Sequence, residues 1–430
     1  MDNDIIHIGT RTHYGGDERL FGITPQDARH HLYVIGKTGS GKTTLLRNLL
    51  IQHACAGRGF ALIDPHGDLA EEILQHIPMH RADDLVYFNP ADLEYPIGIN
   101  LIGQVPPDDR HLVASGIVSA LKSIWGELSW GPRMEYILYN AMAALLDCEN
   151  TTLLGLPRLL TDPAYRDWVV RQVKDPVIRA FWITEFAAYD ERFMREAIAP
   201  IQNKIGQFLA SPPVRNILGQ VKSKVDFRFM MDTGRIFIAN LSKGRLGEDK
   251  ANLLGSLVVT QFQLAAMSRA TMAEEKRRDF FLLIDEFQNF TTDAFASVLS
   301  EARKYHLCLT LSHQYIEQLT PKVRSAVLGN VGGMISFRIG STDAEILERE
   351  FGGDYAASQF VELERFEVLA RILKDGESIG PFRARTIPPI SNAHAKRDVL
   401  IARSREKYGS RRAIVEGKIN RWFASDEYDA

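Results

Sequence analysis

The segment from Gly36 to Thr43 constrains this chain more than any other part of the sequence. It reads Gly-Lys-Thr-Gly-Ser-Gly-Lys-Thr, follows the apolar run 32–35 and opens into the helix-like stretch 44–50. Glycines at this spacing let successive backbone N–H groups turn inward around phosphates, and the start of the following helix adds partial positive charge. The segment therefore predicts a phosphate-binding loop between a buried strand and a helix.

The residue types in this segment suggest individual roles. We expect Lys42 to reach the β and γ phosphates and the Thr43 hydroxyl to ligate Mg²⁺. The alternative is a glycine-rich turn with a surface lysine, which the placement between a strand and a helix disfavours. The expected nucleotide contacts are Gly36, Thr38, Gly39, Ser40, Gly41, Lys42, Thr43 and Thr44.

The composition is that of an ordinary soluble globular protein. The 430 residues are 45% hydrophobic and 24% charged, and no stretch reaches the run of about eighteen apolar residues that a membrane helix needs. The acidic start, Met1 to Asp4, lacks the positive charge of a signal peptide, and the dispersed Cys55, Cys148 and Cys308 suit a reducing compartment. We therefore expect a cytoplasmic protein without direct membrane insertion.

The charge distribution limits the kinds of partner. The net charge of −3 excludes a globally basic nucleic-acid binder but allows a local basic patch. Residues 396–421 hold nine Lys or Arg against three Asp or Glu, and residues 422–430 hold three acids and no base. A solvated helical tail explains this pattern, and the alternative is a contact with nucleic acid or a partner.

The pattern of elements predicts an α/β protein. A chain of 430 residues exceeds what one hydrophobic core usually organises. Short, nearly all-apolar runs alternate with helical stretches, as in a mostly parallel sheet whose strands are buried on both faces. These runs are 32–35, 60–64, 85–88, 235–240, 280–284, 307–312 and 333–339.

Between about 106 and 225 the strand signal vanishes and helical periodicity takes over. The two flanking parts must therefore come together to form one nucleotide-binding core. We expect the first part of this core at 1–105, an all-α insertion at 106–225, the second part of the core at 226–392 and a helical tail at 393–430.

A second motif, from Phe280 to Glu286, is a buried strand that ends in two adjacent carboxylates. We expect Asp285 to hold the Mg²⁺ shell, and Glu286, which is aimed differently, to polarise the attacking water. Alone the pattern is weak, because strands often end in a solvated Asp-Glu turn. The phosphate-binding loop makes the catalytic interpretation the better one.

Two further residues flank the strand at 307–312. Because neighbouring parallel strands present their carboxyl ends at one sheet edge, we expect Gln314 near the γ phosphate, as a sensor or a water-orienting group. The alternative is a polar residue that caps the strand. Arg303 precedes the strand, at the end of a helix where cations suit the helix dipole. It also stands where an arginine can cross to the phosphates of a neighbouring subunit.

Asp64 and His66 follow another strand, at 60–64, on the same expected edge. We expect Asp64 to help organise the catalytic edge, although the sequence assigns it no chemical step. A lone histidine without cysteine or histidine partners is more often structural than a metal ligand, so we expect His66 to be structural.

These residues resemble the FtsK/HerA superfamily of DNA-pumping ATPases and, within it, the type IV secretion coupling proteins of conjugation and their soluble relatives. The resemblance spans most of the chain outside the tail. It rests on Gly-Lys-Thr-Gly-Ser-Gly-Lys-Thr at 36–43, Ile-Asp-Pro-His-Gly-Asp-Leu at 63–69, Ala-Asn-Leu-Ser-Lys-Gly at 239–244, Ile-Asp-Glu-Phe-Gln at 284–288, and Gln314.

The resemblance implies a RecA-like P-loop NTPase core that carries an all-α inserted domain and binds ATP and Mg²⁺. It also implies that Arg303 is the arginine finger donated between subunits of a hexameric ring. One feature departs from the family pattern, because membrane coupling proteins begin with transmembrane helices and none is expected in this sequence.

The leading hypothesis is a Mg²⁺-ATP-driven motor of the conjugative coupling protein type that pumps DNA through an oligomeric ring. Lys243, Arg245 and Lys250, expected in the loop after the strand at 235–240, are candidate contacts to the DNA backbone, with a solvated loop as the alternative. A relaxase or secretion-channel proteins would be further partners. Rival functions are a HerA-like translocase or helicase in DNA processing, a secretion ATPase that acts on protein subunits, and a nucleotide-gated adaptor for a relaxase.

Overall fold

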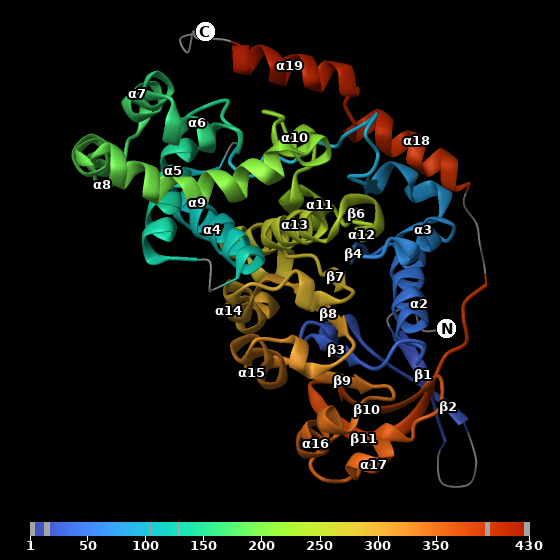
Figure 1. Ribbon diagram of the computed structural model, residues 1–430. Coiled ribbons are helices and arrows are strands. Elements are labelled where there is room, and N and C mark those ends of the chain that lie inside the picture. Colours follow the sequence, from blue (N-terminus) through green and yellow to red (C-terminus); the bar gives the residue numbers. More distant parts are fainter. Residues whose placement is uncertain (1–4, 13–17, 104, 127–129, 392–395, 425–430) are drawn as a thin grey trace. The chain divides into compact units, whose positions relative to one another are not determined.

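One sheet of eleven strands runs through the described part of the chain (Figure 1). The computed structural model describes residues 5–12, 18–103, 105–126, 130–391 and 396–424. The strand order is β2-β1-β11-β10-β9-β3-β8-β7-β4-β6-β5. The strands are β1 Ile6–Thr12, β2 Glu18–Ile23, β3 Leu32–Ile35, β4 Gly59–Asp64, β5 Leu85–Phe88, β6 Ile236–Asn240, β7 Phe280–Ile284, β8 Leu307–His313, β9 Gly333–Ser336, β10 Glu367–Lys374 and β11 Glu377–Thr386.

The central strands run parallel. β3 pairs with β8 and β9, β7 pairs with β8 and β4, and β4 pairs with β6. Strands β3, β4, β7 and β8 are buried along their whole length, because helices cover the sheet on both faces. The mostly parallel sheet expected from the sequence is confirmed. The largest difference in bounds is at β9, which ends at Ser336 rather than at 339.

The sequence did not reveal the four antiparallel strands. β1 pairs with β2 and β11, and β10 pairs with β9 and β11. Along β11, Phe382, Ala384 and Thr386 are buried, whereas Arg383 and Arg385 between them are exposed. A strand with one solvated face alternates in this way and lacks the continuous apolar run that marks the parallel strands, so a search for such runs misses it.

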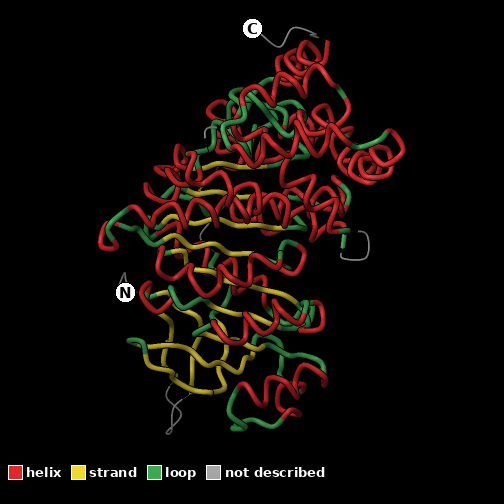
Figure 2. The backbone as a smooth tube through the Cα atoms, turned by 90° about the vertical axis from the view of Figure 1, so that its left-hand side faces the viewer, coloured by secondary structure: helices red, strands yellow, loops and turns green. Residues whose placement is uncertain are grey.

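The chain divides into two compact units. The first comprises Met1–Tyr87, Phe227–Ser242 and Ala265–Ser404, and holds the sheet. Figure 2 shows helices on both sides of the stacked strands. The α-helices that lie wholly within the described part of this unit are α1 Pro25–Ala28, α2 Lys42–Cys55, α3 Asp68–Leu74, α11 Phe227–Thr233, α14 Asp293–Glu301, α15 Pro321–Asn330, α16 Ser341–Glu350 and α17 Ala357–Val361.

Helix α2 connects the phosphate-binding loop to the core. Leu45 and Leu49 of α2 are buried in one apolar cluster with Leu62 of β4 and Leu283 of β7. Burying a leucine side chain contributes about 1.5–3 kcal/mol, so this packing fixes the helix that carries Lys42 against the strands that carry the acids.

The second unit comprises Phe88–Asp226, Lys243–Leu264 and Arg405–Ala430. The helical block expected at 106–225 lies within it, and the contacts assign two further segments to the same unit. The functional division of the chain into four segments stays a prediction. The helices are α4 Arg110–Trp125, α5 Pro132–Asp147, α6 Gly155–Thr161, α7 Pro163–Gln172, α8 Pro176–Ala180, α9 Glu191–Ala210, α10 Pro212–Leu218, α12 Lys243–Leu246 and α19 Arg412–Ala424, while α13 Glu248–Ser268 and α18 Arg397–Tyr408 have residues in both units.

In the described ranges, no helix is both long enough and apolar enough to cross a bilayer.

Candidate active site

The phosphate-binding loop lies between β3 and α2, where the sequence predicts it. Gly39 (φ 77°) and Gly41 (φ 124°) adopt backbone conformations that disfavour any residue with a Cβ. The buried Ser40 hydroxyl has no hydrogen-bond partner among the described residues. A phosphate oxygen is a suitable partner for such a hydroxyl at the start of a helix.

Lys42 is the first residue of α2 and is only 7% exposed. Its Nζ donates to the Gly36 carbonyl, and to the Lys37 carbonyl at 3.4 Å. Burial lowers the pKa of Lys42, and the charges of Glu286 and Asp285 oppose that shift. The lysine and the two carboxylates therefore lie close enough to interact electrostatically, as the prediction of one shared nucleotide site requires.

Asp285 and Glu286 follow β7 and are both buried. Burial, together with the charges of Asp64 and Glu286, raises the pKa of Asp285 to about 6. The backbone of Glu286 is left-handed (φ 45°), and its carboxylate accepts a hydrogen bond from Gln288 Nε2 at 3.0 Å. Clustered buried acids repel one another, so this edge of the sheet favours a bound cation.

Gln314 joins the phosphate-binding loop to this acidic pair. It follows β8, which lies between β3 and β7 in the sheet. Its Nε2 donates to Glu286 Oε1 at 2.9 Å, and its Oε1 accepts from the Thr38 hydroxyl at 3.2 Å. The structure therefore brings together residues predicted from three separate parts of the sequence: Thr38 and Lys42 of the loop, Glu286 and Gln314.

Two contributors to the site were missed in the sequence. The backbone N–H of Phe366 donates to the Ser40 carbonyl at 2.8 Å, and its ring would lie 2.8 Å from a Cβ on Gly41. Phe366 belongs to no local motif, so no sequence signal points to it. Gln288 binds Glu286 and stands two residues after it, and this spacing within Ile-Asp-Glu-Phe-Gln was the available signal.

Asp64 has a structural explanation. Its carboxylate accepts from the backbone N–H groups of His66 at 2.9 Å and Ala70 at 2.8 Å, and so caps the start of α3. It is 1% exposed, and burial raises its pKa. Its charge also raises the pKa of Asp285, so Asp64 does shape the catalytic edge. The His66 side chain is exposed.

Arg303 lies at the opposite edge of the sheet from its own phosphate-binding loop. It is exposed, in the 3-10 turn Ala302–Tyr305 that precedes β8, whereas Gln314 follows β8. Seven strand residues separate the two ends, a length of about 23 Å at a rise of roughly 3.3 Å per residue. Arg303 therefore does not reach the nucleotide site of its own chain.

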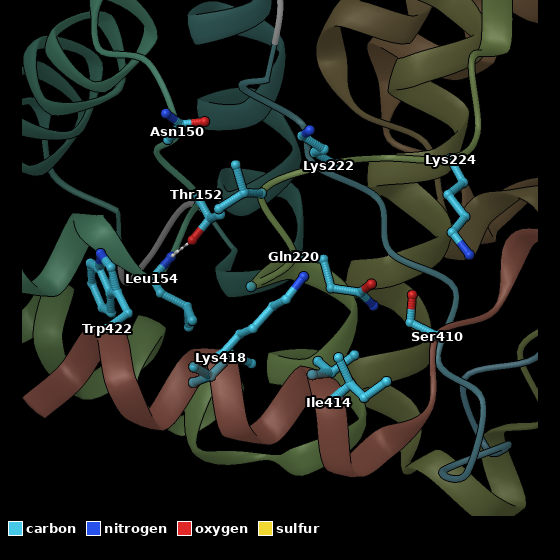
Figure 3. A pocket seen from close by; sticks show the side chains of 14 residues that line it. Asn150, Thr152, Leu154, Gln220, Lys222, Lys224, Ser410, Ile414, Lys418 and Trp422 are labelled. Atoms are coloured by element: carbon cyan, nitrogen blue, oxygen red, sulfur yellow. Dashed lines mark hydrogen bonds between the residues drawn. The ribbon is translucent and has the colours of Figure 1, made fainter. Parts of the chain in front are cut away.

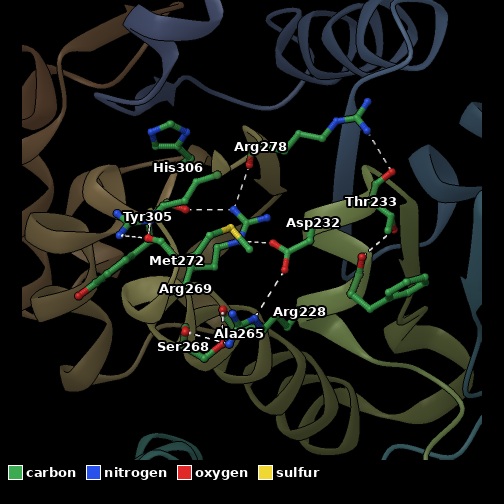
Figure 4. Close-up of polar contacts among 12 residues, drawn as sticks. Arg228, Asp232, Thr233, Ala265, Ser268, Arg269, Met272, Arg278, Tyr305 and His306 are labelled. Carbon is green, nitrogen blue, oxygen red and sulfur yellow. Dashed lines mark hydrogen bonds and ion pairs between the residues drawn. The ribbon is translucent and has the colours of Figure 1, made fainter. Parts of the chain in front are cut away.

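Two arginines hold the turn Ala302–Tyr305. Arg269 is fully buried, with Nε on Asp232 Oδ1 at 2.8 Å and Nη1 on the Tyr305 carbonyl at 3.0 Å (Figure 4). Arg277 donates from Nη1 to the Lys304 carbonyl, and its guanidinium lies 5.7 Å from the centre of the Tyr305 ring. Charged donors on carbonyls make strong hydrogen bonds, so the backbone that displays Arg303 is well fixed.

The candidate DNA contacts do not lie in a loop, and that part of the expectation is wrong. Lys243 and Arg245 are in the short helix α12, and Lys250 is in the first turn of α13. Lys243 pairs with Glu248 at 3.1 Å. Arg245 is exposed and Lys250 is half-buried. The Ser-Lys-Gly sequence reads as a turn, but the apolar Leu246 after it is buried and completes a helical turn.

Comparison with known proteins gives a family match. The family described as type IV secretion-system coupling protein DNA-binding domain matches residues 21–339. The type 4 coupling protein DotL of Legionella pneumophila is 23% identical over 356 residues, which are 68% of this chain and 45% of DotL. The chain thus spans less than half the length of this curated relative.

Solved structures agree in fold. The unbound bacterial conjugative coupling protein TrwBdeltaN70 superposes with a TM-score of 0.63 at 13% identity, covering 90% of this chain and 91% of that chain. VirB4 of Thermoanaerobacter pseudethanolicus gives a TM-score of 0.58 at 14% identity, covering 91% of this chain and 98% of that chain. The expected RecA-like fold is therefore confirmed.

Proposed function

The chain belongs to the family of the type IV secretion-system coupling protein DNA-binding domain, and from this premise we propose that it is an ATP-hydrolysing motor that moves DNA through an oligomeric ring. The hydrogen bonds that join Thr38, Gln314 and Glu286 carry the proposal, because they link the phosphate-binding loop to the carboxylate placed to activate water. TrwB, which shares the fold, has been solved with the ATP analogue ADPNP and with ADP and Mg²⁺.

The residues of the site fit ATP and Mg²⁺. The unpartnered Ser40 hydroxyl, the left-handed glycines and the buried ammonium of Lys42 suit a triphosphate, and the Thr43 hydroxyl with the Asp285 carboxylate suits the metal. Thr43 and Asp285 would hold the Mg²⁺, which would supply positive charge to offset the negative charge that develops on the phosphates.

The chain's own groups divide the remaining work of hydrolysis. Lys42 places a positive charge at the phosphates, and Glu286 accepts a proton from the attacking water. Gln314 donates to one oxygen of the Glu286 carboxylate, and Gln288 donates to the other. Through its bond to Thr38, Gln314 is thus placed to signal to Glu286 whether a nucleotide occupies the phosphate-binding loop.

We propose that Arg303 completes the site of a neighbouring subunit. Its position at the far edge from its own loop, on a turn fixed by Arg269 and Arg277, supports donation in trans. An arginine supplied in this way is worth about 10³–10⁵ in rate, so hydrolysis would require assembly. We expect a closed ring, and the family resemblance favours six subunits.

The proposed polymer is DNA, held mainly through its phosphates. Such binding tolerates any sequence and weakens with salt. Arg245 and Lys250 remain candidate contacts, whereas Lys243 is paired with Glu248 and is the weaker candidate. A relaxase and secretion-channel proteins are proposed as further partners.

The decisive experiment measures ATP turnover and oligomer mass with no DNA, with single-stranded DNA and with double-stranded DNA. We expect DNA to stimulate turnover and to shift the mass toward a ring. Turnover that protein substrates stimulate but DNA does not would indicate a secretion ATPase that acts on proteins. If the chain binds nucleotide but shows no turnover in all three conditions, it is a nucleotide-gated adaptor.

A further inference from the structure

A groove in the helical unit has no role in the proposed motor. It has a volume of about 450 Å³ and is enclosed by α19, the segment after α10 and the segment before α6 (Figure 3). Its lining residues are Asn150, Thr152, Leu154, Gly219, Gln220, Val221, Lys222, Lys224, Ser410, Ile414, Val415, Lys418, Ile419 and Trp422.

The floor of the groove is apolar. Leu154, Val415 and Ile419 are buried there, and Ile414 and Val221 at the rim are 54% and 39% exposed. Large exposed aliphatic side chains beside an apolar hollow are typical of a surface that binds another molecule. A hollow of this volume accepts a few side chains rather than a folded domain.

The charge at the groove has one sign. Among the described residues, the lining holds Lys222, Lys224 and Lys418 and no acidic side chain. Lys224 Nζ donates to the Gly409 carbonyl at 2.7 Å, whereas Lys222 and Lys418 form no ion pair with the described residues. A positive rim on a chain whose net charge is −3 is a local feature that calls for a negative partner.

The basic C-terminal segment, residues 396–421, supplies Lys418 to this groove. Most of its arginines are neutralised by acids that hold the helices in place, including Arg405 by Asp92 at 2.6 Å and Arg412 by Glu416 at 2.9 Å. Lys418, on the same helix as Arg412, is exposed and directed toward the centre of the groove (Figure 3). Lys418 therefore brings positive charge from the basic C-terminal segment to this groove.

The groove is preformed. Asn216 Nδ2 donates to Glu416 Oε1 at 3.1 Å, and Arg158 Nη1 donates to the Trp422 carbonyl at 3.0 Å, so both halves of α19 are tied to the rest of the unit. When a binding site is already formed, little binding free energy is spent on ordering the protein as the ligand binds.

We propose that this groove docks an acidic peptide segment of a partner protein, which inserts apolar side chains against Leu154 and Ile419 and sets carboxylates against Lys222 and Lys418. Nucleic acid fits less well, because the floor is aliphatic and Trp422 is the single aromatic ring among the described lining residues, so the groove offers no row of rings on which bases could stack. The lysines at the rim would speed association and select against basic segments.

Fluorescence anisotropy of the full chain without nucleotide tests the proposal independently of the motor. The probe is fluorescein-labelled Gly-Asp-Leu-Glu-Trp-Leu-Glu-Asp-Gly, compared with the analogue that has lysine at each acidic position and with a labelled twelve-nucleotide oligo-dT. We expect the acidic probe to bind at least about tenfold more tightly than its lysine analogue, in a salt-dependent way.

Variants assign the binding to the groove. The double variant Lys222→Glu with Lys418→Glu should lower the affinity for the acidic probe about tenfold or more. Val221→Asp, which leaves both lysines in place, should also lower this affinity. Lys174→Glu, at an exposed lysine outside the groove, is the matched control and should change nothing. Equal affinity for the acidic and lysine probes, or binding that these variants leave intact, overturns the proposal. Tighter binding of oligo-dT that the double variant abolishes would reassign the groove to nucleic acid.

Discussion

Gln314 Nε2 and Glu286 Oε1 lie 2.9 Å apart, and this hydrogen bond joins the ends of two neighbouring strands of the sheet. The same Gln314 amide accepts from Thr38 in the phosphate-binding loop. Both ends of one side chain are thereby engaged, one by the loop and one by the acid. Gln314 is placed to transmit the state of the loop to Glu286.

Gln314→Ala should separate binding from turnover. Glu286 then loses the hydrogen bond from Gln314 and keeps only that from Gln288, so we expect kcat to fall about tenfold to a hundredfold while nucleotide affinity changes little. Steady-state ATPase kinetics and equilibrium binding of a labelled nucleotide measure the two effects. Gln318→Ala is the control, because the side chain of that nearby glutamine accepts from the Tyr315 backbone N–H. A normal kcat would show that Gln314 merely ends the strand.

Glu286→Gln should trap bound ATP. Removal of the general base costs about 10²–10⁴ in turnover, whereas the phosphate-binding loop and Asp285 stay intact. We therefore expect nucleotide affinity at or above that of the wild type and almost no phosphate release. A single-turnover assay checks this result, and a variant that hydrolyses ATP at the wild-type rate would exclude Glu286 as the base.

Lys42→Ala, unlike Glu286→Gln, should weaken nucleotide binding. The substitution removes the buried ammonium that lies against the loop carbonyls and is coupled to both acids. We expect nucleotide affinity to fall together with hydrolysis, which isothermal titration with ATP and Mg²⁺ measures directly. Retention of turnover would contradict the assignment of the phosphate-binding loop.

Arg277→Gln should weaken catalysis from a distance. The guanidinium holds the Lys304 carbonyl beside Arg303, so we expect the DNA-stimulated kcat to fall about tenfold with the KM for ATP nearly unchanged. Arg278→Gln is the matched control, because the neighbouring arginine also binds carbonyls, those of Thr233 and Gly57, but none in the turn Ala302–Tyr305.

Arg303→Ala distinguishes the two ways in which that prediction can fail. If Arg303→Ala leaves hydrolysis unchanged, the arginine finger itself is refuted. If it abolishes hydrolysis while Arg277→Gln does not, only the positioning role of Arg277 is wrong. Rescue by Arg277→Lys, which keeps a charged donor, would support positioning over general destabilisation.

His53 should make the protein sensitive to acid. It is buried in α2, stacked on Phe281 at 4.0 Å between ring centres, and burial lowers its pKa from 6.5 to about 3. The unfolded chain therefore binds a proton below pH 6.5 that the folded chain does not, and stability falls as the pH decreases from 6.5 toward 3. At pH 5 the loss is about 2 kcal/mol relative to pH 7.5.

His53→Phe should remove this contribution while keeping a ring on Phe281. Urea unfolding at pH 7.5 and pH 5 measures the effect, and the variant should lose about 2 kcal/mol less than the wild type between these two values. His80→Phe, at an exposed histidine, is the control. An equal loss in wild type and His53→Phe would show that the histidine is not held neutral.

Much of the site follows from local sequence. The spacing from Gly36 to Thr43 specifies the loop, because glycine is strongly favoured at the positive-φ backbone conformations of 39 and 41. The apolar run before Asp285 specifies a buried strand with acids at its end. Parallel pairing then implies that Gln314 lies near them, since carboxyl ends of such strands share one edge.

The tertiary structure decided the rest, because it depends on residues far apart in the chain. Phe366 closes on Gly41 from the antiparallel side of the sheet, where β11 alternates buried and exposed residues and carries no continuous apolar run. Asp64 proves to be a helix cap, since its partners are backbone N–H groups placed by the following turn. Arg269 belongs to no sequence motif, yet it is fully buried, with Asp232 and the carbonyls of Arg278 and Tyr305 as its hydrogen-bond partners. Local pattern determines which elements form and which chemistry they carry, whereas burial and partners arise only when distant segments pack together.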